Sequence, residues 1–416
     1  MKLLEFDNQA ITAELNNIGQ WWLKNTLDDK HGGFVGEIDF TGNVVEGATK
    51  GIVQNSRILW FYSEKALFSD KPEYEEAATR AFDYLLTYFD DVELGGAIWE
   101  VSASGEPING KKQTYAQSFC IYAFCAYYKL TGNKVALTKA MQYFELVEEH
   151  ARDRKFGGYI EAYTQDWQVI DDLRLSEKDL NAPKSMNTHL HVLEAYSALY
   201  AVAPDEVVKE ALEHVIDVFN EFIIDKEIKH LRLFFDKQWN DMSETISYGH
   251  DIEASWLLWE AVEILNDKDK IAYFKPIIID LAAACLDQAI GKHGQVCDEY
   301  ELADNIRHEE SHWWVQAEAL VGFLNAYYLT GESQYLDACN KIWLFIQRYH
   351  IDHFAGEWHW MSSADNNERT AIYKTGFWKA PYHNGRAMME VVKLFNLIEV
   401  NISETALQNT KLSCKG

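Results

Sequence analysis

The sequence predicts an all-α fold, an (α/α)6 barrel in which six helical hairpins close into a ring. Three observations lead to this prediction. Apolar residues follow helical spacing over most of the chain, the pattern repeats about every 62 residues, and a loop of glycine and aromatic residues recurs in the repeats. A closed, repetitive architecture also explains how 416 residues can form one domain. We expect a single domain over residues 1–416, with a polar C-terminal tail from about residue 398.

The helices are predicted from apolar residues spaced three and four apart. This spacing is clear in "PEYEEAATRAFDYLLTYF", "QSFCIYAFCAYYKLTG", "MNTHLHVLEAYSALYAV" and "WWVQAEALVGFLNAYYLTG". Two of these stretches end in Thr-Gly, as expected where a helix stops, and the whole chain contains only six prolines. A stretch such as "SWLLWEAVEIL", which is apolar on most faces, suits an inner ring of buried helices.

The repeat is defined by glycines in loops such as "HGGFVGEID", "LGGAIWEV" and "FGGYIEAYTQDW". Successive spacings of 63, 62, 136 and 62 residues separate the glycines Gly33, Gly96, Gly158, Gly294 and Gly356. The long gap holds two periods, and "LRLFFDKQWND" occupies the vacant position without a glycine, which gives six units. The alternative is an open helical solenoid. The closed barrel is favoured because the loops converge on aromatic residues, so that they would build one cleft rich in Trp, Tyr and acidic side chains.

Composition excludes several classes of partner. The chain has 38 basic and 65 acidic residues, a net charge of −27, and no basic stripe, so nucleic acid is not an expected partner. No stretch approaches the roughly 20 apolar residues of a membrane helix. The N-terminus does not resemble a secretion signal, because charge interrupts its short apolar run. The cysteines form no CxxC pair and no regular spacing, which suits a reducing compartment; they are Cys120, Cys125, Cys285, Cys297, Cys339 and Cys414. We therefore expect a soluble cytoplasmic protein.

Four stretches place histidines with aromatic and carboxylate residues near the starts of apolar helices. They contain Asn187, His189 and His191; His250 and Glu253; His308, His312, Trp313 and Trp314; and Trp378, His383 and Arg386. In a barrel, helix starts from different repeats can point into one shared cavity. The repetition of this arrangement is what favours a functional site.

The spacing within these stretches favours proton transfer over metal binding. His250 and Glu253 lie three apart, so on a helix they share a face and can hydrogen-bond, which would raise the basicity of the imidazole. A structural helix cap is the alternative for this pair, and packing against aromatic neighbours is the alternative for His383. His189 and His191 are two apart and point in different directions, and no HExxH pattern occurs, so a metal site is not favoured.

Arg57 precedes the apolar run "ILWFY", where an arginine must be paired or bind an anionic oxygen. A salt bridge to an acidic residue is the alternative. Trp313 and Trp378 are either core residues or flat surfaces for a sugar ring.

The sequence resembles the cellobiose 2-epimerase family within the N-acylglucosamine 2-epimerase superfamily. The similar segments are "GEID", "KGIVQNSRILWFYS", "MNTHLHVLEAY", "YGHDIEASWLL", "WWVQAEALVGFLNAY" and "GFWKAPYHNGRA", from about Glu37 to Glu390. The resemblance implies an (α/α)6 barrel that epimerises C2 of the reducing-end sugar of β-1,4-linked disaccharides. Cellobiose would give 4-O-glucosyl-mannose, and mannobiose or lactose would be handled likewise. It implies no metal, nucleotide or redox cofactor, and we expect a monomer.

The resemblance also implies roles for individual residues. His250 and His383 would be the acid/base pair, with Glu253 supporting His250. Arg57 and a protonated His191 would stabilise the charge that develops on O1 of a cis-enediolate after the C2 proton is removed. The residues implied to contact the rings and hydroxyls of the sugar are Trp313, Trp378, Asn187, Tyr115, Asp179 and Glu299.

Four other functions stay open at this point. An aldose–ketose isomerase would share the enediolate, and an N-acylglucosamine 2-epimerase would share the barrel, although "GFWKAPYHNGRA" disfavours the latter. A glycoside hydrolase would need two carboxylates around the scissile bond, for which Glu253 and Glu299 are candidates. A non-catalytic sugar-binding protein would keep the tryptophans but would not need both His250 and His383.

Overall fold

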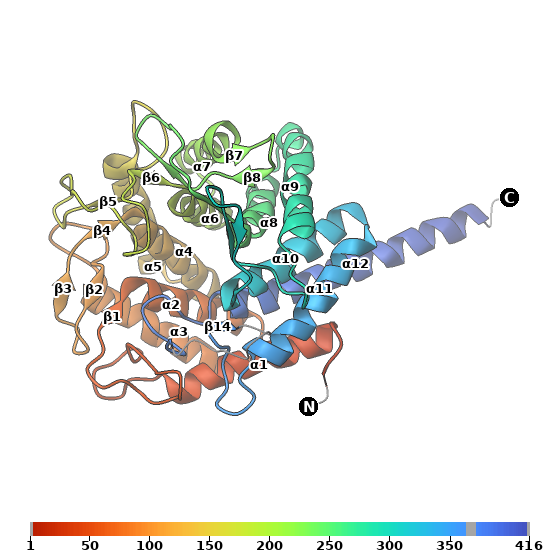
Figure 1. Ribbon diagram of the computed structural model, residues 1–416. Coiled ribbons are helices and arrows are strands. Elements are labelled where there is room, and N and C mark those ends of the chain that lie inside the picture. Colours follow the sequence, from red (N-terminus) through yellow and green to blue (C-terminus); the bar gives the residue numbers. More distant parts are fainter. Residues whose placement is uncertain (1–2, 363–371, 414–416) are drawn as a thin grey trace.

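The computed structural model describes residues 3–362 and 372–413, which form two concentric rings of helices (Figure 1). The inner ring consists of α2 (Ile52–Leu67), α4 (Thr114–Thr131), α6 (Met186–Val202), α8 (Tyr248–Leu265), α10 (Trp313–Thr330) and α12 (His383–Ser413). The outer ring consists of α1 (Asn8–Asn25), α3 (Pro72–Tyr84), α5 (Lys134–Leu146), α7 (Glu206–Val218), α9 (Lys268–Gln288) and α11 (Ser333–Phe345). Each inner helix packs against its two inner neighbours, and the ring closes where α12 contacts α2. The predicted (α/α)6 barrel is confirmed.

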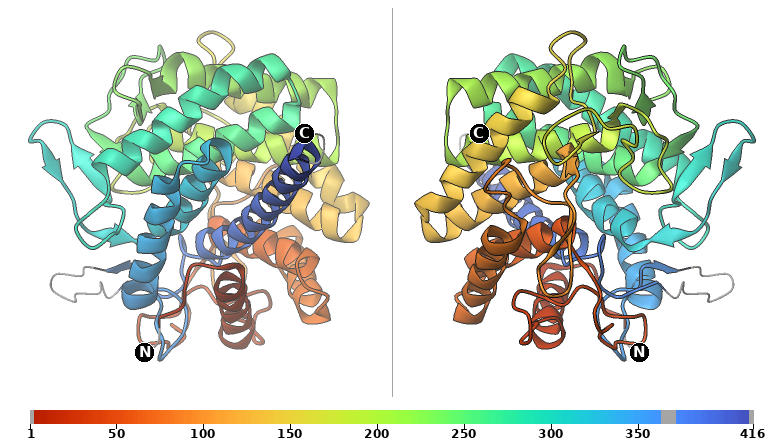
Figure 2. Two further views of the ribbon diagram at one scale, coloured as in Figure 1. Left: turned by 90° about the vertical axis from the view of Figure 1, so that its right-hand side faces the viewer. Right: turned by 90° about the vertical axis from the view of Figure 1, so that its left-hand side faces the viewer.

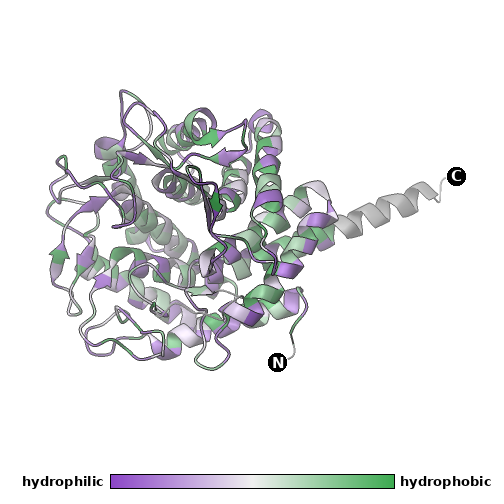
Figure 3. Cartoon of the chain, viewed as in Figure 1, coloured by the Kyte–Doolittle hydropathy of each residue, from purple (hydrophilic) through white to green (hydrophobic). Residues whose placement is uncertain are grey.

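The two rings differ in the pattern of their apolar residues. The inner helix α10 is buried along most of its length, and even its polar residues Gln316 and Glu318 are inaccessible to solvent. The outer helix α7 is amphipathic, and it buries Val208, Leu212 and Val215 on a single face. Figure 3 shows hydrophobic residues along the helices of both rings, with hydrophilic residues interspersed on the outer helices. The core therefore lies between and within the rings, as the sequence pattern predicts.

A short hairpin follows every outer helix, at the position of the predicted repeat loops. Its two ends pair as Leu27 with Phe34, Asp90 with Ala97, Arg152 with Tyr159, Ile224 with Leu231, Ile290 with Val296 and Ile351 with Trp358. Four of these outer helices first end in a π-helical turn, namely η1 (Leu85–Phe89), η2 (Val147–Ala151), η3 (Phe219–Ile223) and η4 (Ile346–His350). In the unit without a loop glycine, Lys229 adopts the left-handed backbone conformation with φ 60°. The prediction of six units, including the fourth, is confirmed.

Two-residue and three-residue strands join the units at the end of the barrel where the inner helices begin. The pairs β1–β2, β4–β5, β6–β9, β10–β11 and β13–β14 each connect one unit to the next, and the bridge between Ile38 and Thr375 connects the sixth unit to the first. Figure 2 shows the sheet formed by β10, β11 and β12 projecting from the ring. The strands are β1 (Lys50–Gly51), β2 (Glu100–Val101), β3 (Pro107–Asn109), β4 (Lys112–Gln113), β5 (Ala162–Tyr163), β6 (Lys184–Ser185), β7 (Ile224–Asp225), β8 (His230–Leu231), β9 (Phe234–Phe235), β10 (Thr245–Ser247), β11 (Glu299–Glu301), β12 (Ile306–Arg307), β13 (Ser311–His312) and β14 (Met361–Ser362).

The glycine at position 158 is required by both its backbone and its surroundings. Gly158 has φ +73°, and a Cβ atom there would lie 2.4 Å from the Trp239 ring and 2.7 Å from the His189 ring. His189 supports the same loop, because its Nε2 accepts a hydrogen bond from the Tyr159 amide at 2.9 Å and its Nδ1 contacts the Ser185 carbonyl at 2.6 Å. Both nitrogens of His189 are therefore used to hold the hairpin.

A buried lysine anchors four of the six hairpins. In each case a lysine between the hairpin and the next inner helix binds the aspartate that follows the first paired residue of the hairpin, in the pairs Lys50–Asp28, Lys112–Asp91, Lys184–Asp153 and Lys374–Asp352, with N–O distances of 2.7 to 2.9 Å. Lys184 also donates to the carbonyls of Gly157 and Lys237. Lys50, Lys112 and Lys184 tie their hairpins to the starts of α2, α4 and α6, and Lys374 ties its hairpin to the segment that leads to α12.

We expect Lys184→Met to lower the free energy of unfolding by about 3–5 kcal/mol, because it leaves the Asp153 carboxylate without its buried counterion. Urea denaturation followed by circular dichroism measures this change. The matched control is Lys237→Met, whose side chain is exposed, and it is expected to change stability by less than about 0.5 kcal/mol. Equal effects in the two variants would contradict the anchoring role.

The last helix continues beyond the barrel. The region predicted as a polar tail, from about residue 398, has a helical backbone that runs without a break to Ser413, and Figure 1 shows it extending away from the rings. Across the described part of the chain, no helix has the length and apolarity needed to span a membrane.

Candidate active site

A cleft opens at the end of the barrel where the inner helices begin. We call it the central cleft. It has a volume of about 490 Å³ and is lined by residues of all six units, among them Arg57, Tyr115, Asp179, Asn187, His191, His250, Glu253, Trp313, Trp314, Trp360, Trp378 and His383. Ten of the eleven residues predicted from the sequence therefore face one cleft. The eleventh, Glu299 on β11, lines an adjoining cavity of about 490 Å³, which shares Asp179, Asn187, His250 and Trp314 with the cleft.

The polar residues converge because they occupy the first turns of the inner helices. His383 and Trp313 are the first residues of α12 and α10, and His250 is the third residue of α8. Asn187 and His191 lie in the first two turns of α6. The strand pairs described above hold these helix starts side by side, which confirms the expectation that they meet in a shared cavity.

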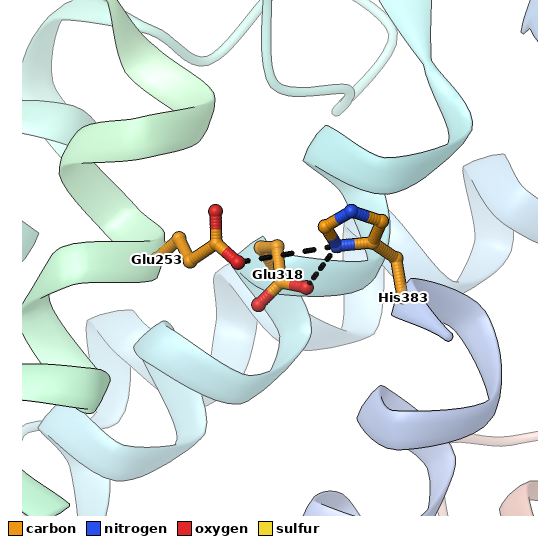
Figure 4. Close-up of side chains that lie close together, drawn as sticks. All are labelled: Glu253, Glu318 and His383. Atoms are coloured by element: carbon orange, nitrogen blue, oxygen red, sulfur yellow. Dashed lines mark hydrogen bonds and ion pairs between the residues drawn. The ribbon is translucent and has the colours of Figure 1, made fainter. Parts of the chain in front are cut away.

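His383 is oriented by a carboxylate from the neighbouring helix. Its Nδ1 lies 2.6 Å from Glu318 Oε1 and 4.0 Å from Glu253 Oε1 (Figure 4). A carboxylate accepts, so Nδ1 carries the proton and the lone pair of Nε2 remains for a ligand. The second oxygen of Glu318 accepts from the Trp256 indole at 3.0 Å, which fixes the carboxylate itself.

The predicted hydrogen bond between His250 and Glu253 is not formed, and that prediction is corrected. His250 Nδ1 instead contacts the Ser247 hydroxyl at 2.7 Å, because the ring turns back toward the residue that precedes the helix. Glu253 turns toward the barrel axis, where its Oε1 accepts from Arg386 at 2.6 Å. Glu253 therefore pairs with Arg386 and lies 4.0 Å from His383, rather than supporting His250.

Arg386 is the centre of a buried charge cluster below the cleft. It is 1% exposed, and its guanidinium binds Glu253 at 2.6 Å, Glu318 at 2.7 Å and Glu194. Burial raises the pKa of Glu253 and of Glu318. Burial acts in the same direction on Glu194, but Arg386 outweighs it and the pKa of Glu194 falls to about 2.

The three side chains in Figure 4 could in principle offer ligand atoms to a metal ion. The chemistry of the cluster argues against this use. The oxygens that face His383 are the same Oε1 atoms that accept from Arg386. The guanidinium thus already supplies the positive charge that these carboxylates need, and a second cation would lie directly against it.

Burial keeps the imidazoles of the cleft neutral. It lowers the pKa of His250 to about 4, with a further contribution from His191. It also lowers the pKa of His383 and of His191, and Arg57 and Arg386 add to the effect on both. The expectation of a protonated His191 is therefore corrected: its Nδ1–H donates to Glu194 at 3.0 Å, and the ring is neutral near pH 7.

Arg57 places a positive charge in the cleft. It donates to the Trp378 carbonyl and to the Tyr115 hydroxyl, each at 2.7 Å, and its guanidinium lies 4.5 Å from the centre of the Phe119 ring. Within the described residues it forms no salt bridge, so the salt-bridge alternative is wrong. Neutral partners leave its charge uncompensated, as a site for an anionic oxygen requires.

Aromatic rings form the walls of the cleft. Trp313 packs against Trp360 with centroids 4.3 Å apart, and Trp314 lies 4.8 Å from His250 and 5.7 Å from His383. Trp313 Nε1 and Asn187 Oδ1 are buried without a hydrogen-bond partner in the described chain. Flat rings with unpaired polar atoms beside them are suited to a sugar, whose faces are apolar and whose edges carry hydroxyls.

Several residues of the site had no role predicted from the sequence, namely Glu194, Ser247, Trp314, Glu318, Trp360 and Arg386. A usable signal existed for two of them. Glu194 and Glu318 are single carboxylates inside otherwise apolar helices, where a charge must be paired. Trp360 and Ser247 lie in loops and strands whose position only the closed ring defines.

The chain is similar to known sugar epimerases over most of its length. The profile of the family described as N-acylglucosamine 2-epimerase (GlcNAc 2-epimerase) matches residues 32–387. A protein named cellobiose 2-epimerase from Bacteroides fragilis is 41% identical over 389 residues, covering 93% of this chain and 99% of that protein. The solved structure of cellobiose 2-epimerase from Spirochaeta thermophila has a TM-score of 0.86 at 39% identity, covering 94% of this chain and 97% of that one. A sugar epimerase from a ruminal bacterium has a TM-score of 0.89 at 34% identity, with 93% and 98% covered.

Proposed function

The chain belongs to the N-acylglucosamine 2-epimerase family, and from this premise we propose that it is a cellobiose 2-epimerase. It is an isomerase that inverts C2 of the reducing-end sugar of β-1,4-linked disaccharides, with cellobiose, mannobiose and lactose as candidate substrates. The observation that carries the proposal is the placement of His250 and His383 in one cleft beside Trp314. Two neutral imidazoles at one aromatic cleft suit removal of a proton from carbon and its return to the other face.

The first chemical step is removal of the C2 proton from the open-chain aldehyde. His383 is suited to this step because Glu318 holds the proton on Nδ1 and leaves Nε2 as the base. The electron pair of the C2–H bond moves into a C1–C2 double bond, and O1 gains negative charge. Arg57, whose charge has no carboxylate partner in the described chain, stabilises that oxygen in the resulting cis-enediolate.

The second step returns a proton to the opposite face of C2. His250 is suited to it because its Nδ1 partner is a hydroxyl, and Ser247 can either donate to the ring or accept from it. When Ser247 donates to Nδ1, Nε2 of His250 carries a proton. Its transfer to C2 leaves His250 as imidazolate, which takes a proton from solvent while His383 releases the proton it removed. Rotation about the C2–C3 bond presents the second face, and the reverse reaction exchanges the two roles.

The same geometry disfavours a glycoside hydrolase. Glu253 is bound by Arg386, and Glu299 lines the adjoining cavity rather than the central cleft. A hydrolase needs two carboxylates that both face the scissile bond. The proposal also includes a single-domain monomer that acts in the cytoplasm, which the acidic composition and the irregular cysteine spacing support.

Incubation with cellobiose in deuterated water tests the proposed function. We expect a disaccharide that ends in mannose and carries deuterium at C2, because the proton that His250 delivers comes from an N–H group that exchanges with solvent. Nuclear magnetic resonance and mass spectrometry of the product measure this. A ketose product would indicate an aldose–ketose isomerase, and free glucose would indicate a hydrolase; either result would refute the proposal.

The acidic limb of the pH profile is expected well below the ordinary histidine pKa of about 6.5. Activity requires a neutral imidazole, which exists above its pKa, and burial lowers the pKa of His250 to about 4. Values of kcat/KM measured from pH 3.5 to 8 should therefore hold through pH 6 and fall as the pH drops toward about 4. Circular dichroism at each pH separates titration from unfolding, and a midpoint at 6.5 in a folded enzyme would contradict neutral buried imidazoles.

A further inference from the structure

A second cavity lies inside the inner ring at the end opposite the central cleft. We call it the basal cavity. It has a volume of about 300 Å³, at the lower end of the range of ligand pockets, and five of the six inner helices line it. Its lining residues include Trp60 and Glu64 of α2, Tyr122 and Lys129 of α4, Glu194 and Ser197 of α6, Glu260 of α8, and Glu390 and Lys393 of α12. These residues lie two or more turns below the helix starts that form the cleft.

The inner part of the basal cavity holds a hydroxyl without a hydrogen-bond partner in the described chain and two aromatic rings. Ser197 is 3% exposed, and its hydroxyl has no hydrogen-bond partner among the described residues. A buried hydroxyl without a partner is unfavourable, so this one is suited to a ligand group. Beside it, the rings of Trp60 and Tyr122 stack with centroids 5.2 Å apart, and such rings attract organic cations through their faces.

The charges of the cavity leave one carboxylate uncompensated. Glu64 pairs with Lys129 at 3.0 Å, and Glu390 pairs with Lys393 at 2.7 Å. Glu194 is held by Arg386 from the other side. Glu260 has no ion pair in the described part of the chain. Its side chain is exposed to solvent, and its position in the cavity wall and then the Glu390 carboxylate raise its pKa. A ligand with a single positive charge would relieve both the repulsion and the missing pair.

We propose that the basal cavity binds a small monovalent organic cation of the alkylammonium type. Glu260 would pair with its charge, the Trp60 and Tyr122 rings would contact its alkyl groups, and Ser197 would hydrogen-bond a polar substituent. A divalent metal ion suits the cavity less, because such ions need six or more oxygen ligands and the walls include Ala126, Ala198 and Ala201.

The basal cavity shares one residue with the catalytic side of the barrel. Glu194 lines the cavity, and its carboxylate accepts from Tyr382 at 2.7 Å and contacts His191 Nδ1 at 3.0 Å, where His191 in turn lines the central cleft. The two sites are therefore separated by a single layer of side chains. The proposal is tested by binding rather than by turnover, so its outcome is independent of the proposed function.

Isothermal titration of the full-length protein with choline chloride tests the proposal. We expect saturable binding with one site per chain, unchanged when potassium chloride or magnesium chloride is present at equal ionic strength. Glu260→Gln should weaken choline binding about tenfold or more, because it removes the cavity carboxylate that has no ion pair among the described residues. The matched control is Glu263→Gln on the same helix, which does not line the cavity and should bind choline like the wild type.

A second variant keeps the test decisive if Glu260→Gln is poorly folded. Ala198→Phe fills the cavity from its wall without changing any charge, and it should abolish choline binding while thermal unfolding remains cooperative. The proposal is overturned if wild-type protein shows no saturable binding. It is also overturned if magnesium or potassium displaces choline, or if the Glu260 and Glu263 variants bind equally.

Discussion

His383→Ala and His250→Ala are each expected to lower kcat on cellobiose by about 10²–10⁴-fold, which is the range for loss of a general acid or base. Each variant removes the group that exchanges a proton with C2 and leaves the aromatic walls in place. The value of KM should change far less than kcat, because Arg57, Trp313 and Trp378, the residues proposed to bind the sugar, still line the cleft in both variants. Steady-state kinetics with quantified epimer products measures the effect.

The matched control for these two variants is His31→Ala, since His31 lies in a partly exposed hairpin outside the cleft. It should keep wild-type kcat and KM. Deuterium exchange at C2 adds a more specific measurement. A variant that retains one histidine can remove the C2 proton and return deuterium to the same face, which labels the substrate without forming product. Wild-type rates in either catalytic variant would refute the assignment of the acid/base pair.

Arg386→Met is expected to destabilise the fold by at least about 3–5 kcal/mol, the range for breaking a buried ion pair by removal of one partner. Three buried carboxylates, those of Glu194, Glu253 and Glu318, would lose the guanidinium that they share. Urea denaturation at pH 7 measures the loss. The stability of Arg386→Lys should lie between those of the wild type and Arg386→Met, because lysine keeps the charge but cannot reach all three carboxylates.

A double variant tests the cause of this destabilisation. Adding Glu253→Gln to Arg386→Met removes one unpaired charge, so it should restore part of the lost stability. Simple additivity of the two single effects, or a stability of Arg386→Met within about 1 kcal/mol of the wild type, would contradict the shared-charge interpretation.

The fold and the location of the site were predictable because both follow from periodic features of the sequence. Helical spacing and the recurring loop glycines predicted six units, and one vacancy in that pattern was filled correctly by the stretch near Leu231. Histidines at helix starts predicted a common cleft because the closed barrel gathers those starts at one end.

The partners of the site residues were not predictable in the same way. Helical geometry allowed His250 to bond Glu253, but tertiary contacts gave each of them another partner, Ser247 and Arg386. Glu318 reaches His383 across 65 positions of sequence, and no local pattern encodes that distance. The protonation of His191 likewise depends on burial, which only the assembled ring sets.

The closure of the ring through Ile38 and Thr375 has a consequence for truncation. An open array of repeats can lose a terminal repeat and keep the remaining ones folded. Here each of the six helical units contributes one residue to the central cleft, namely Arg57, Tyr115, His191, His250, Trp313 and His383. Deleting any one unit therefore removes a wall of the cleft and leaves the two neighbouring units without a packing partner. Partial unfolding should therefore eliminate catalysis outright, with no shortened but active intermediate.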